Sequence, residues 1–453
     1  MDYGVASLNL NITNSLCSFL SDLKFEDLPQ EAVHAGRRGI LDWVGCALIG
    51  STHPTVTTVL EVLAASSETQ HATIFGHELR LGVLEAPIAN GLMGHVLDFD
   101  DTHMNGVVLH ASSPVLAALF SLAEKRPTAG FEFLTAYVAG FEAGVRVGQA
   151  SPGHHRGGWH LTGTLGSIAA GAASGRLLAL TAGQLTHAVG IATTQAAGMQ
   201  QNRGTMCKSF HAGKAAQNGV LAALLAERGF DSSEEIIEGK KGFCRIYSDV
   251  ANPELVLDEL GTRWEIARNG YKPYACGVLM HPAIDAMIEL GTAVAADVSR
   301  IEAVEAVVHP LAVSVTGISD PRSGLQSKFS LTHSAAVALL DRTAGILQYT
   351  DERALSPDVL ALSKKIKVTT DESLRTDEAS ASVVVGGRRV EAVVEHATGT
   401  IANPMSDALL ESKFFSNASA ILGTERATAL RDKIWAIESI TDVREITALC
   451  IPN

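Results

Sequence analysis

Hydrophobic positions in the first half of the chain repeat with a helical period. From about residue 8 to 230, Ala, Leu and Gly dominate and strand-type alternation is scarce. Ser113-Pro114 predicts an N-cap followed by a first helical turn, and Thr181-Ala-Gly-Gln184 predicts a capping box. Small residues on one face of Gly166–Ser174 would let a neighbouring helix approach closely. These patterns predict an α-helical bundle.

The pattern changes near residue 270. β-branched residues gather in Ile301–Thr316, and polar and apolar residues alternate in Lys365–Thr369. Ala381–Glu395 predicts a hairpin with Gly386-Gly387 at its turn. Helical patterns lie between these predicted strands, at His281–Ala295 and Leu331–Leu340. Strands and helices therefore mix in this part of the chain.

Helical patterns return near the end of the chain, at Asp407–Ser416 and Glu425–Glu438. We therefore predict a mainly α protein with an inserted α+β domain. Residues 1–267 and 400–453 would form the large all-helical domain, and residues 268–399 a smaller α+β lid domain. A cleft between two such domains is a natural place for a ligand.

The composition is that of a globular protein, since 46% of the 453 residues are apolar and 19% are charged. The six cysteines form no CxxC pair, which indicates reduced thiols. A net charge of −14 without a basic cluster disfavours nucleic acid and anionic membranes as partners. Met1–Leu23 lacks a basic segment followed by an apolar core, so we expect no leader peptide and a cytoplasmic protein.

The run His95–His110 holds three aspartates and three histidines. If Pro87–Phe99 is a helix, Asp98, Asp101 and Thr102 share the face at its C-terminal end. This arrangement is compatible with a solvated acidic helix end, a metal site, or carboxylates that orient imidazoles for proton transfer. No HExxH or EF-hand pattern accompanies the run, so we predict no metal.

Further cations and imidazoles lie along the chain. His160 stands just before a Gly- and Thr-rich helix start. Lys208 lies just ahead of a helix predicted from residue 211 to about 228, where free N–H groups and a cation would bind a carboxylate or phosphate. A surface lysine near a turn is the alternative. Tyr271–His281 and Lys328–His333 add lysines and histidines near the predicted domain junction.

Six motifs occur in order over nearly the whole chain: Asp98-Phe-Asp-Asp-Thr102, Gly158-Trp-His-Leu-Thr-Gly-Thr-Leu-Gly166, Lys208-Ser-Phe-His-Ala-Gly213, Tyr271-Lys-Pro-Tyr-Ala-Cys276, Lys328-Phe-Ser330 and Asn403-Pro-Met-Ser406. Together they resemble the MmgE/PrpD family, which includes 2-methylcitrate dehydratase, cis-aconitate decarboxylase and iminodisuccinate epimerase. The resemblance implies a helical domain with an α+β lid, a homodimer, and no metal or other cofactor.

The resemblance also implies the site residues. Catalytic positions would be Asp98, Thr102, His110, His160, Lys208 and Lys272. His333 stands where many members carry a tyrosine, and we include it as a second proton carrier. Substrate-binding positions would be Thr162 and His211, together with Lys208 and Lys272.

Each reaction named in the family moves a proton on carbon beside a carboxylate. The enzyme must hold the carboxylate against cations while a base takes the proton. Lys208, Lys272 and the helix start near residue 211 would supply the cations, and His110 or His160 the base and acid, with Asp98 fixing a tautomer.

We therefore predict a lyase for a small di- or tricarboxylate, similar to 2-methylcitrate dehydratase or cis-aconitate decarboxylase. An epimerase of an amino- or imino-dicarboxylate such as iminodisuccinate is the alternative, favoured if His160 faces His333. A noncatalytic polycarboxylate-binding protein and a metal-dependent hydrolase are hypotheses from other classes.

Overall fold

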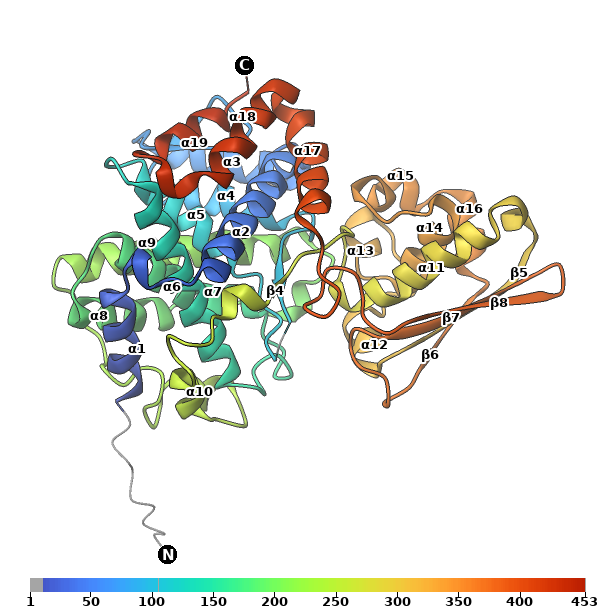
Figure 1. The fold of residues 1–453 in the computed structure, drawn as a ribbon, viewed down its shortest axis with the longest axis horizontal. Helices are drawn as coiled ribbons and strands as arrows, with labels where there is room; N and C mark the ends of the chain where they lie inside the picture. The colour runs from blue at the N-terminus through green and yellow to red at the C-terminus, as the bar shows by residue number, and fades with distance from the viewer. Residues whose placement is uncertain (1–10, 105, 453) are drawn as a thin grey trace, which may run out of the picture.

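Helices make up most of the part of the chain that the structure describes, and the fold is mainly α as predicted (Figure 1). This computed structural model describes residues 11–104 and 106–452, and only the backbone of residues 296–298. Residues 1–10 lie outside the described residues, and so does Asn105 of the acidic run. The expectation about a leader peptide concerned Met1–Leu23, so it falls partly on these residues.

Residues 12–247 form a bundle of helices, of which α10 is a short one: α1 Ile12–Asp22, α2 Gln30–Gly50, α3 Pro54–Ser66, α4 Ala86–His95, α5 Ser112–Ala123, α6 Gly130–Gln149, α7 Leu161–Leu177, α8 Ala182–Thr193, α9 Met206–Glu227 and α10 Phe243–Tyr247. The predicted capping box is confirmed, because Gln184 N donates to the Thr181 hydroxyl at the start of α8. Helices α7 and α9 lie against each other, and a Cβ on Gly219 of α9 would overlap the Ala170 backbone of α7. The small residues of α7 thus allow the close packing that the sequence predicted.

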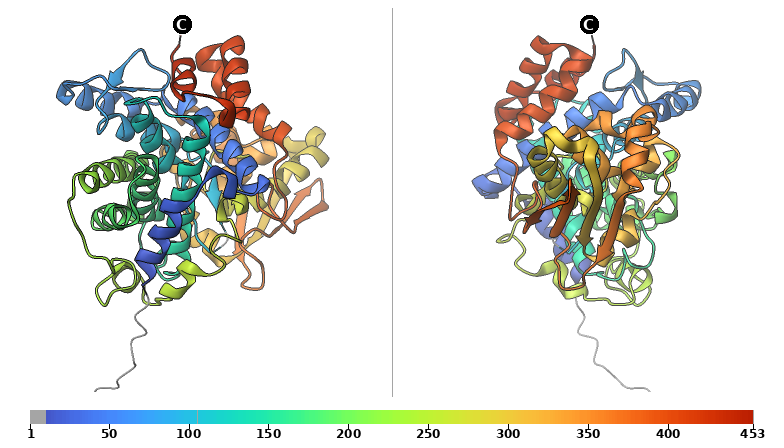
Figure 2. Two further views of the ribbon diagram at one scale, coloured as in Figure 1. Left: turned by 60° about the vertical axis from the view of Figure 1, so that its left-hand side comes forward. Right: turned by 90° about the vertical axis from the view of Figure 1, so that its right-hand side faces the viewer.

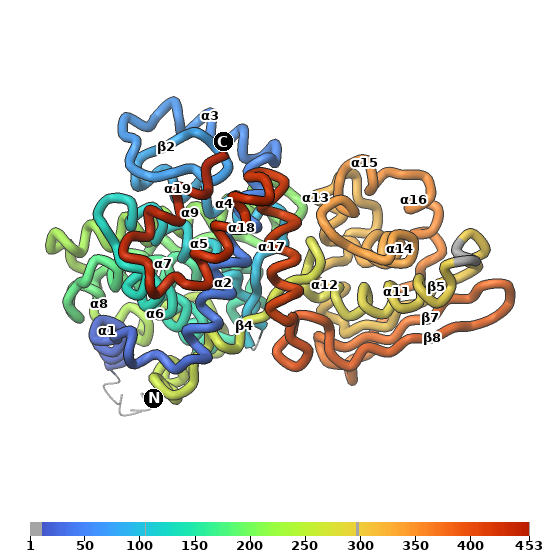
Figure 3. The backbone as a smooth tube through the Cα atoms, turned by 45° about the horizontal axis from the view of Figure 1, so that its top comes forward, coloured from blue at the N-terminus to red at the C-terminus, as the bar shows by residue number. Residues whose placement is uncertain are grey.

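The last helices return to this bundle. They are α17 Asp407–Leu422, α18 Thr424–Trp435 and α19 Arg444–Leu449, and α17 lies along α2 (Figures 1 and 3). Lys413 of α17 is buried there and donates to Asp42 Oδ1 of α2 at 2.7 Å. We call α1–α10 with α17–α19 the helical body. None of the helices in the described residues is both long enough and apolar enough to cross a membrane.

The described strands that form the one larger sheet lie at the far end of the molecule from this body (Figure 1). They are β5 Ile301–Val308, β6 Ile366–Thr370, β7 Ala379–Val385 and β8 Arg388–Val394. The order is β6-β5-β7-β8, with β5 and β6 parallel and the other pairs antiparallel. The predicted hairpin is confirmed, since Gly386 and Gly387 form its turn with φ values of 55° and 73°.

The β-branched run Ile301–Thr316 is a strand only over its first half, which corrects the sequence reading. Strand β5 ends at Val308, and residues Pro310–Thr316 form helix α12. The His309 side chain accepts a hydrogen bond from Leu311 N at 3.0 Å, and Pro310 occupies the first turn, so capping overrides strand propensity here.

Helices cover one side of this sheet (Figures 1 and 2). Helices α11 His281–Ala293 and α14 Leu331–Asp341 contact its strands, and α12, α13 Gly324–Ser327, α15 Asp351–Ala354 and α16 Pro357–Ser363 lie in the same part of the chain. We call α11–α16 with β5–β8 the sheet lobe. The domain boundaries at residues 267/268 and 399/400 remain predictions.

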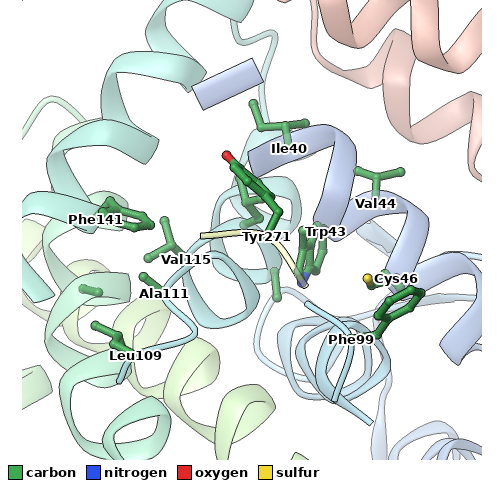
Figure 4. Packing of buried hydrophobic residues seen from close by; sticks show 14 of the residues in the cluster. Ile40, Trp43, Val44, Cys46, Phe99, Leu109, Ala111, Val115, Phe141 and Tyr271 are labelled. Atoms are coloured by element: carbon green, nitrogen blue, oxygen red, sulfur yellow. The ribbon is translucent and has the colours of Figure 1, made fainter. Parts of the chain in front are cut away.

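Two short strands join the body to the segment that enters the lobe. Strand β3, Thr102–His103, pairs antiparallel with β4, Asn269–Gly270. The next residue, Tyr271, donates its N–H to Gly399 O at 2.9 Å and packs in the buried core near Ile40 and Trp43 of α2 (Figure 4). Another two-stranded ribbon, β1 Ala72–Thr73 with β2 Arg80–Leu81, lies in the body. The β3–β4 pair places the acidic run beside the residues that lead into the lobe.

Candidate functional site

Helix α4 ends at His95, earlier than predicted, so Asp98, Asp101 and Thr102 do not share a helix face. Asp98 follows the helix with φ of 52°, in the left-handed region. A non-glycine residue there costs on the order of 1–3 kcal/mol and persists only where its surroundings hold it. The reason is tertiary, because lysine side chains from other parts of the chain bind the carbonyl groups of Leu97 and Asp98.

The Asp98 carboxylate lies between two ammonium groups. Lys208 Nζ donates to Asp98 Oδ1 at 2.6 Å, and Lys272 Nζ lies 3.2 Å from the same oxygen and donates to the Asp98 carbonyl at 3.0 Å. Burial alone would raise the pKa of Asp98, but Lys208 and Lys272 hold it well below its usual range. Asp98 is therefore ionised, and its Oδ2 has no hydrogen-bond partner among the described residues.

Lys208 belongs to helix α9 itself. The helix begins at Met206, not at residue 211, and Lys208 occupies its first turn. The loop before the helix ends at Thr205, whose backbone is extended, and Gly204 before it has φ of 75°. The helix therefore starts five residues earlier than the sequence pattern predicted. The lysine still adds its charge to the positive end of the helix dipole, as expected.

Asp100, rather than Asp98, orients the imidazoles, which corrects the expected tautomer partner. His95 Nδ1 donates to Asp100 Oδ2 at 2.9 Å, and His110 Nδ1 lies 3.6 Å from Asp100 Oδ1. Ser113 Oγ donates to Asp100 Oδ2 at 2.8 Å. Ser113 is therefore not the N-cap of α5, whose N-cap residue is Ala111.

His110 is held in one tautomer by its neighbours. Its Nδ1 donates to the Asp101 carbonyl at 2.9 Å and lies 3.0 Å from Thr102 Oγ1. Because a carbonyl only accepts, Nδ1 carries the hydrogen and Nε2 keeps a lone pair. His95 is arranged in the same way, since its Nδ1 faces Asp100 and Lys208 Nζ lies 3.0 Å from its Nε2. The hydrogen bonds thus leave each Nε2 as an acceptor.

Four imidazoles form a row along the body side of the site. The ring centroid of His95 lies 4.6 Å from that of His110 and 5.5 Å from that of His160. The ring centroids of His160 and His211 are 5.1 Å apart. Burial holds the pKa values of His110 and His160 well below the usual range. For His160, the nearby charge of Lys208 lowers the pKa further. The rings are therefore neutral at pH 7 and able to accept a proton.

Asp101 is the exception among the three acids. Burial and the charge of Asp42 raise its pKa well above the usual range. Ser112 and Asn269 both donate to its Oδ2. Asp101 is therefore a neutral group that ties the acidic run to α5 and β4, not a member of the charged site.

A third lysine enters from the sheet lobe. Lys328 lies at the end of α13, is buried, and donates to Leu97 O at 2.8 Å and Ala275 O at 2.7 Å. It lines a cavity of about 10 Å³ together with Asp98, Lys208 and Phe329. The charges of the three lysines, Asp98 and Asp100 sum to about +1, so the site is locally cationic in a protein of net charge −14.

The structure brings together most of the predicted residues. Asp98, Thr102, His110, His160, Lys208, Lys272 and His211 form a connected group, which we call the site cluster, with His95, Asp100 and Lys328 as members that the sequence reading did not select. His95 and Asp100 stood in the same run as Asp98, and Lys328 in a quoted motif. Their residue types were visible, but nothing in the sequence told which of the neighbouring acids would face the imidazoles.

Two predicted residues have no bond to the site cluster among the described residues. Thr162 lies in the first turn of α7, and its hydroxyl is buried without a partner there. His333 lies in α14, where its Nε2 bonds the Gln348 carbonyl at 2.9 Å and its ring packs on Tyr349. No contact between His160 and His333 is found among the described residues. The roles assigned to Thr162 in substrate binding and to His333 in proton transfer remain predictions.

One group of side chains in the site cluster has the residue types and the spacing of metal ligands. One ligand atom each from His95, Asp100 and His110 lie within 4.8 Å of one another. However, Lys208 lies 3.0 Å from His95, and Asp100 already accepts hydrogen bonds from His95 and Ser113. A second cation would meet the lysine charges at close range, so the donor set fits proton transfer better than a divalent ion.

A larger cavity, of about 670 Å³, lies beside the site cluster between body and lobe. Its body side includes Met104, Val108 and Leu161, which are sequence neighbours of Thr102, His110 and His160. Its other side includes Leu311 of the sheet lobe and Val278, which lies just before α11. The charged members of the site cluster do not line this cavity, so it lies beside the cluster without containing it.

Comparison with known proteins gives the family. The model of the MmgE/PrpD N-terminal domain matches residues 14–256, and that of the MmgE/PrpD C-terminal domain matches residues 274–438. Similar proteins include the cis-aconitate decarboxylase of Aspergillus terreus, 27% identical over 97% of this chain and 95% of the relative, and that of Homo sapiens, 24% identical over 97% and 94%. The cis-aconitate decarboxylase-like protein oryM of Aspergillus oryzae is 29% identical over 97% of both chains. The chain therefore belongs to the MmgE/PrpD family.

Proposed function

We propose that this protein is a lyase acting on a small di- or tricarboxylate, and that decarboxylation of cis-aconitate is the first reaction to test. The observation that carries the proposal is the convergence of Lys208 and Lys272 on Asp98 beside a row of neutral imidazoles. The names of the similar proteins favour decarboxylation over the other reactions of the family.

The lysines would bind the carboxylates of the substrate. In the structure they are balanced in part by Asp98, whose second oxygen has no partner among the described residues. An incoming carboxylate would share the ammonium groups of Lys208 and Lys272 and meet a site of positive net charge. Fixed cations at this place stabilise negative charge that develops on a substrate carboxylate in the transition state.

The imidazoles would carry the proton. In decarboxylation the bond between carbon and a carboxylate breaks, CO2 leaves, and the electron pair stays delocalised towards a remaining carboxylate until a proton is added to carbon. His110 presents the lone pair of Nε2 and is neutral in this structure. A bound polyanion raises the pKa of a neighbouring imidazole, so His110 or His160 would take up a proton on binding and deliver it to carbon.

The substrate would enter by a movement of the sheet lobe. The cavity between Asp98, Lys208 and Lys328 measures about 10 Å³, which holds about one water molecule and no tricarboxylate. We infer that body and lobe are separate folding units, and that the 670 Å³ cavity between them is the approach to the cluster.

The test is incubation of the purified protein with cis-aconitate, 2-methylcitrate and iminodisuccinate in D2O, followed by NMR. A decarboxylase releases CO2 and leaves one deuterium on the product; a dehydratase forms a new alkene; an epimerase exchanges the α-proton without changing the carbon skeleton. We expect Lys208→Met to lower turnover by about 100-fold or more. Lys214→Met is the matched control, since Lys214 lies in the same helix with an exposed side chain bonded to Gln217.

Other outcomes would replace the proposal. Thermal stabilisation by a polycarboxylate without turnover of any of the three compounds would indicate a noncatalytic binding protein. Exchange of the α-proton alone would establish the epimerase. A homodimer and a cytoplasmic location stay predictions, which size-exclusion chromatography with light scattering and cell fractionation can check.

A further inference from the structure

Three lysines bind three successive backbone carbonyl groups at the centre of the site. Lys328 Nζ donates to Leu97 O at 2.8 Å, Lys272 Nζ to Asp98 O at 3.0 Å, and Lys413 Nζ to Phe99 O at 2.6 Å. These lysines come from the end of α13, from the segment after β4, and from α17. The turn of residues 97–99 is therefore held by cations from three separate parts of the chain.

The physical need for these cations follows from the end of helix α4. The helix stops at His95, so residues 97–99 follow its C-terminal end, where the helix dipole is negative and cations are favoured. Asp98 in addition adopts a left-handed backbone conformation that its side chain disfavours. Ammonium donors on the flanking carbonyls stabilise this conformation, and it is this conformation that directs the carboxylate of Asp98 to Lys208.

The three lysines differ in where they are anchored. Lys413 belongs to the helical body and pairs there with Asp42. Lys328 belongs to the sheet lobe, where its own carbonyl accepts from Gly277 N at 3.0 Å and its ammonium lies 4.9 Å from the centre of the Tyr349 ring. Its bond to Leu97 thus crosses from lobe to body.

We propose that Lys328 is a positioning residue that couples docking of the sheet lobe to the active arrangement of Asp98. The proposal rests on the proposed function. When the lobe is docked, Lys328 fixes the Leu97 carbonyl and the Asp98 turn; when the lobe moves away, Leu97 O loses this donor and Asp98 is free to leave the two site lysines. Binding of substrate and assembly of the catalytic group become one event.

The charge state of Lys328 makes the coupling depend on pH. The groups that act on it are Asp98, Lys208, Lys272 and Cys276, and it in turn acts on His53 and His333. Burial, together with Lys272 and Lys208, lowers the pKa of Lys328 to about 8, although Asp98 opposes the change. Lys328 is charged below this pH and becomes a neutral, weaker donor above it. The Asp98 turn should therefore loosen as the pH rises through about 8.

The test compares Lys328→Arg and Lys328→Met with the wild type by two measurements. The first is kcat/KM against pH, in which we expect an alkaline decline centred near pH 8 for the wild type. Arginine keeps its charge at every accessible pH, so Lys328→Arg should move the decline to higher pH. Lys328→Met should lower kcat/KM by about 100-fold at pH 7, because the Asp98 turn loses a charged donor.

The second measurement needs no substrate. The Asp98 amide donates to His95 O at 3.1 Å, so its hydrogen exchange reports opening of the turn. Opening rates are compared after correction for intrinsic exchange. In the wild type we expect the Asp98 turn to open faster above pH 8 than below it. In Lys328→Met it should open fast at every pH, and in Lys328→Arg it should open slowly at every pH. If no compound is turned over, this measurement still decides the role of Lys328, and the proposed function fails separately.

Lys413→Met is the control for a merely structural loss. It removes a buried donor from the same turn but from within the body, so it should lower the melting temperature while leaving the alkaline decline of the protein near pH 8. Equal Asp98 exchange in Lys328→Met and wild type would overturn the proposal. So would an alkaline decline that stays at the same pH in Lys328→Arg.

Discussion

His160 and His211 face each other through the same ring atom, with 2.9 Å between the two Nδ1 nitrogens. Two neutral imidazoles can make this contact only if one Nδ1 carries hydrogen and the other does not, so the rings hold opposite tautomers. His160 caps α7 while His211 lies in α9, and the close approach of these helices sets the distance. The ring that donates keeps its lone pair on Nε2, where it can take up the proton that is later delivered to the substrate.

This pair gives the first prediction. Replacing His160 by Ala should lower kcat by about 100-fold or more, the usual contribution of a side chain that transfers a proton in the transition state. His211→Ala should cost less, because it removes only the partner that fixes the tautomer of His160. His211→Asn should recover part of this loss, since the amide offers a donor and an acceptor near the place of Nδ1.

Steady-state kinetics of these variants checks the pair. An Asn variant that is no better than the Ala variant would contradict tautomer control. The exposed His71, which lies in the helical body away from the site cluster, provides a control for the substitution itself.

Asp98 gives a prediction with opposite signs for binding and turnover. Asp98→Asn removes the negative charge between Lys208 and Lys272 and leaves an acceptor oxygen, so the net charge of the site rises by one. An inert tricarboxylate such as tricarballylate should then bind about tenfold more tightly, while kcat falls because the lysines lose their alignment.

Isothermal titration calorimetry measures the binding change. Asp432→Asn is a suitable control, because this exposed carboxylate pairs with Arg431 in helix α18. Weaker binding to Asp98→Asn than to the wild type would show that Asp98 does not compete with the substrate for the lysines.

His154 gives a prediction about stability. It is buried among Trp159, Phe243 and Tyr247, and neither ring nitrogen has a hydrogen-bond partner among the described residues. Burial lowers its pKa from about 6.5 to about 3, so as the pH falls from 7 to 5 the unfolded chain takes up a proton here that the folded chain does not. The folded state thereby loses on the order of 2 kcal/mol over this range.

Replacing His154 by Leu should therefore raise the free energy of unfolding, more at pH 5 than at pH 7. Denaturant unfolding at the two pH values measures the difference. His34, whose ring is partly exposed beside Asp407, serves as the comparison site. An equal effect of His154→Leu at both pH values would mean that the ring takes up its proton over the same pH range in the folded protein as in the unfolded chain.

The last prediction concerns metal. Because Lys208 approaches His95 to 3.0 Å and Lys272 lies 3.2 Å from the nearby Asp98, a divalent ion at His95, Asp100 and His110 would be repelled by two fixed charges. Dialysis against EDTA should leave turnover unchanged, and the dialysed protein should contain no stoichiometric metal by elemental analysis. Loss of activity with EDTA and recovery with one metal ion would reverse this conclusion.

Local patterns in the sequence were enough for several elements. The Thr181 capping box and the Gly386-Gly387 hairpin are as predicted, because the atoms that stabilise them lie within a few residues of one another. The six motifs indicated the family before any fold was known. Local patterns erred at the end of α4, where lysines from distant parts of the chain bind the following carbonyl groups, and at the start of α9.

The sequence by itself determined which chemical groups are present and, through capping and alternation, most of the helices and strands. Only the tertiary structure decided which acid meets which base: Asp98 joins the lysines and Asp100 joins the imidazoles. Along the chain, Asp98 is 110 residues from Lys208 and 174 residues from Lys272, and Leu97 is 231 residues from Lys328. No local pattern specifies such pairs, because their geometry follows from how the packed helices and the lobe place distant segments side by side.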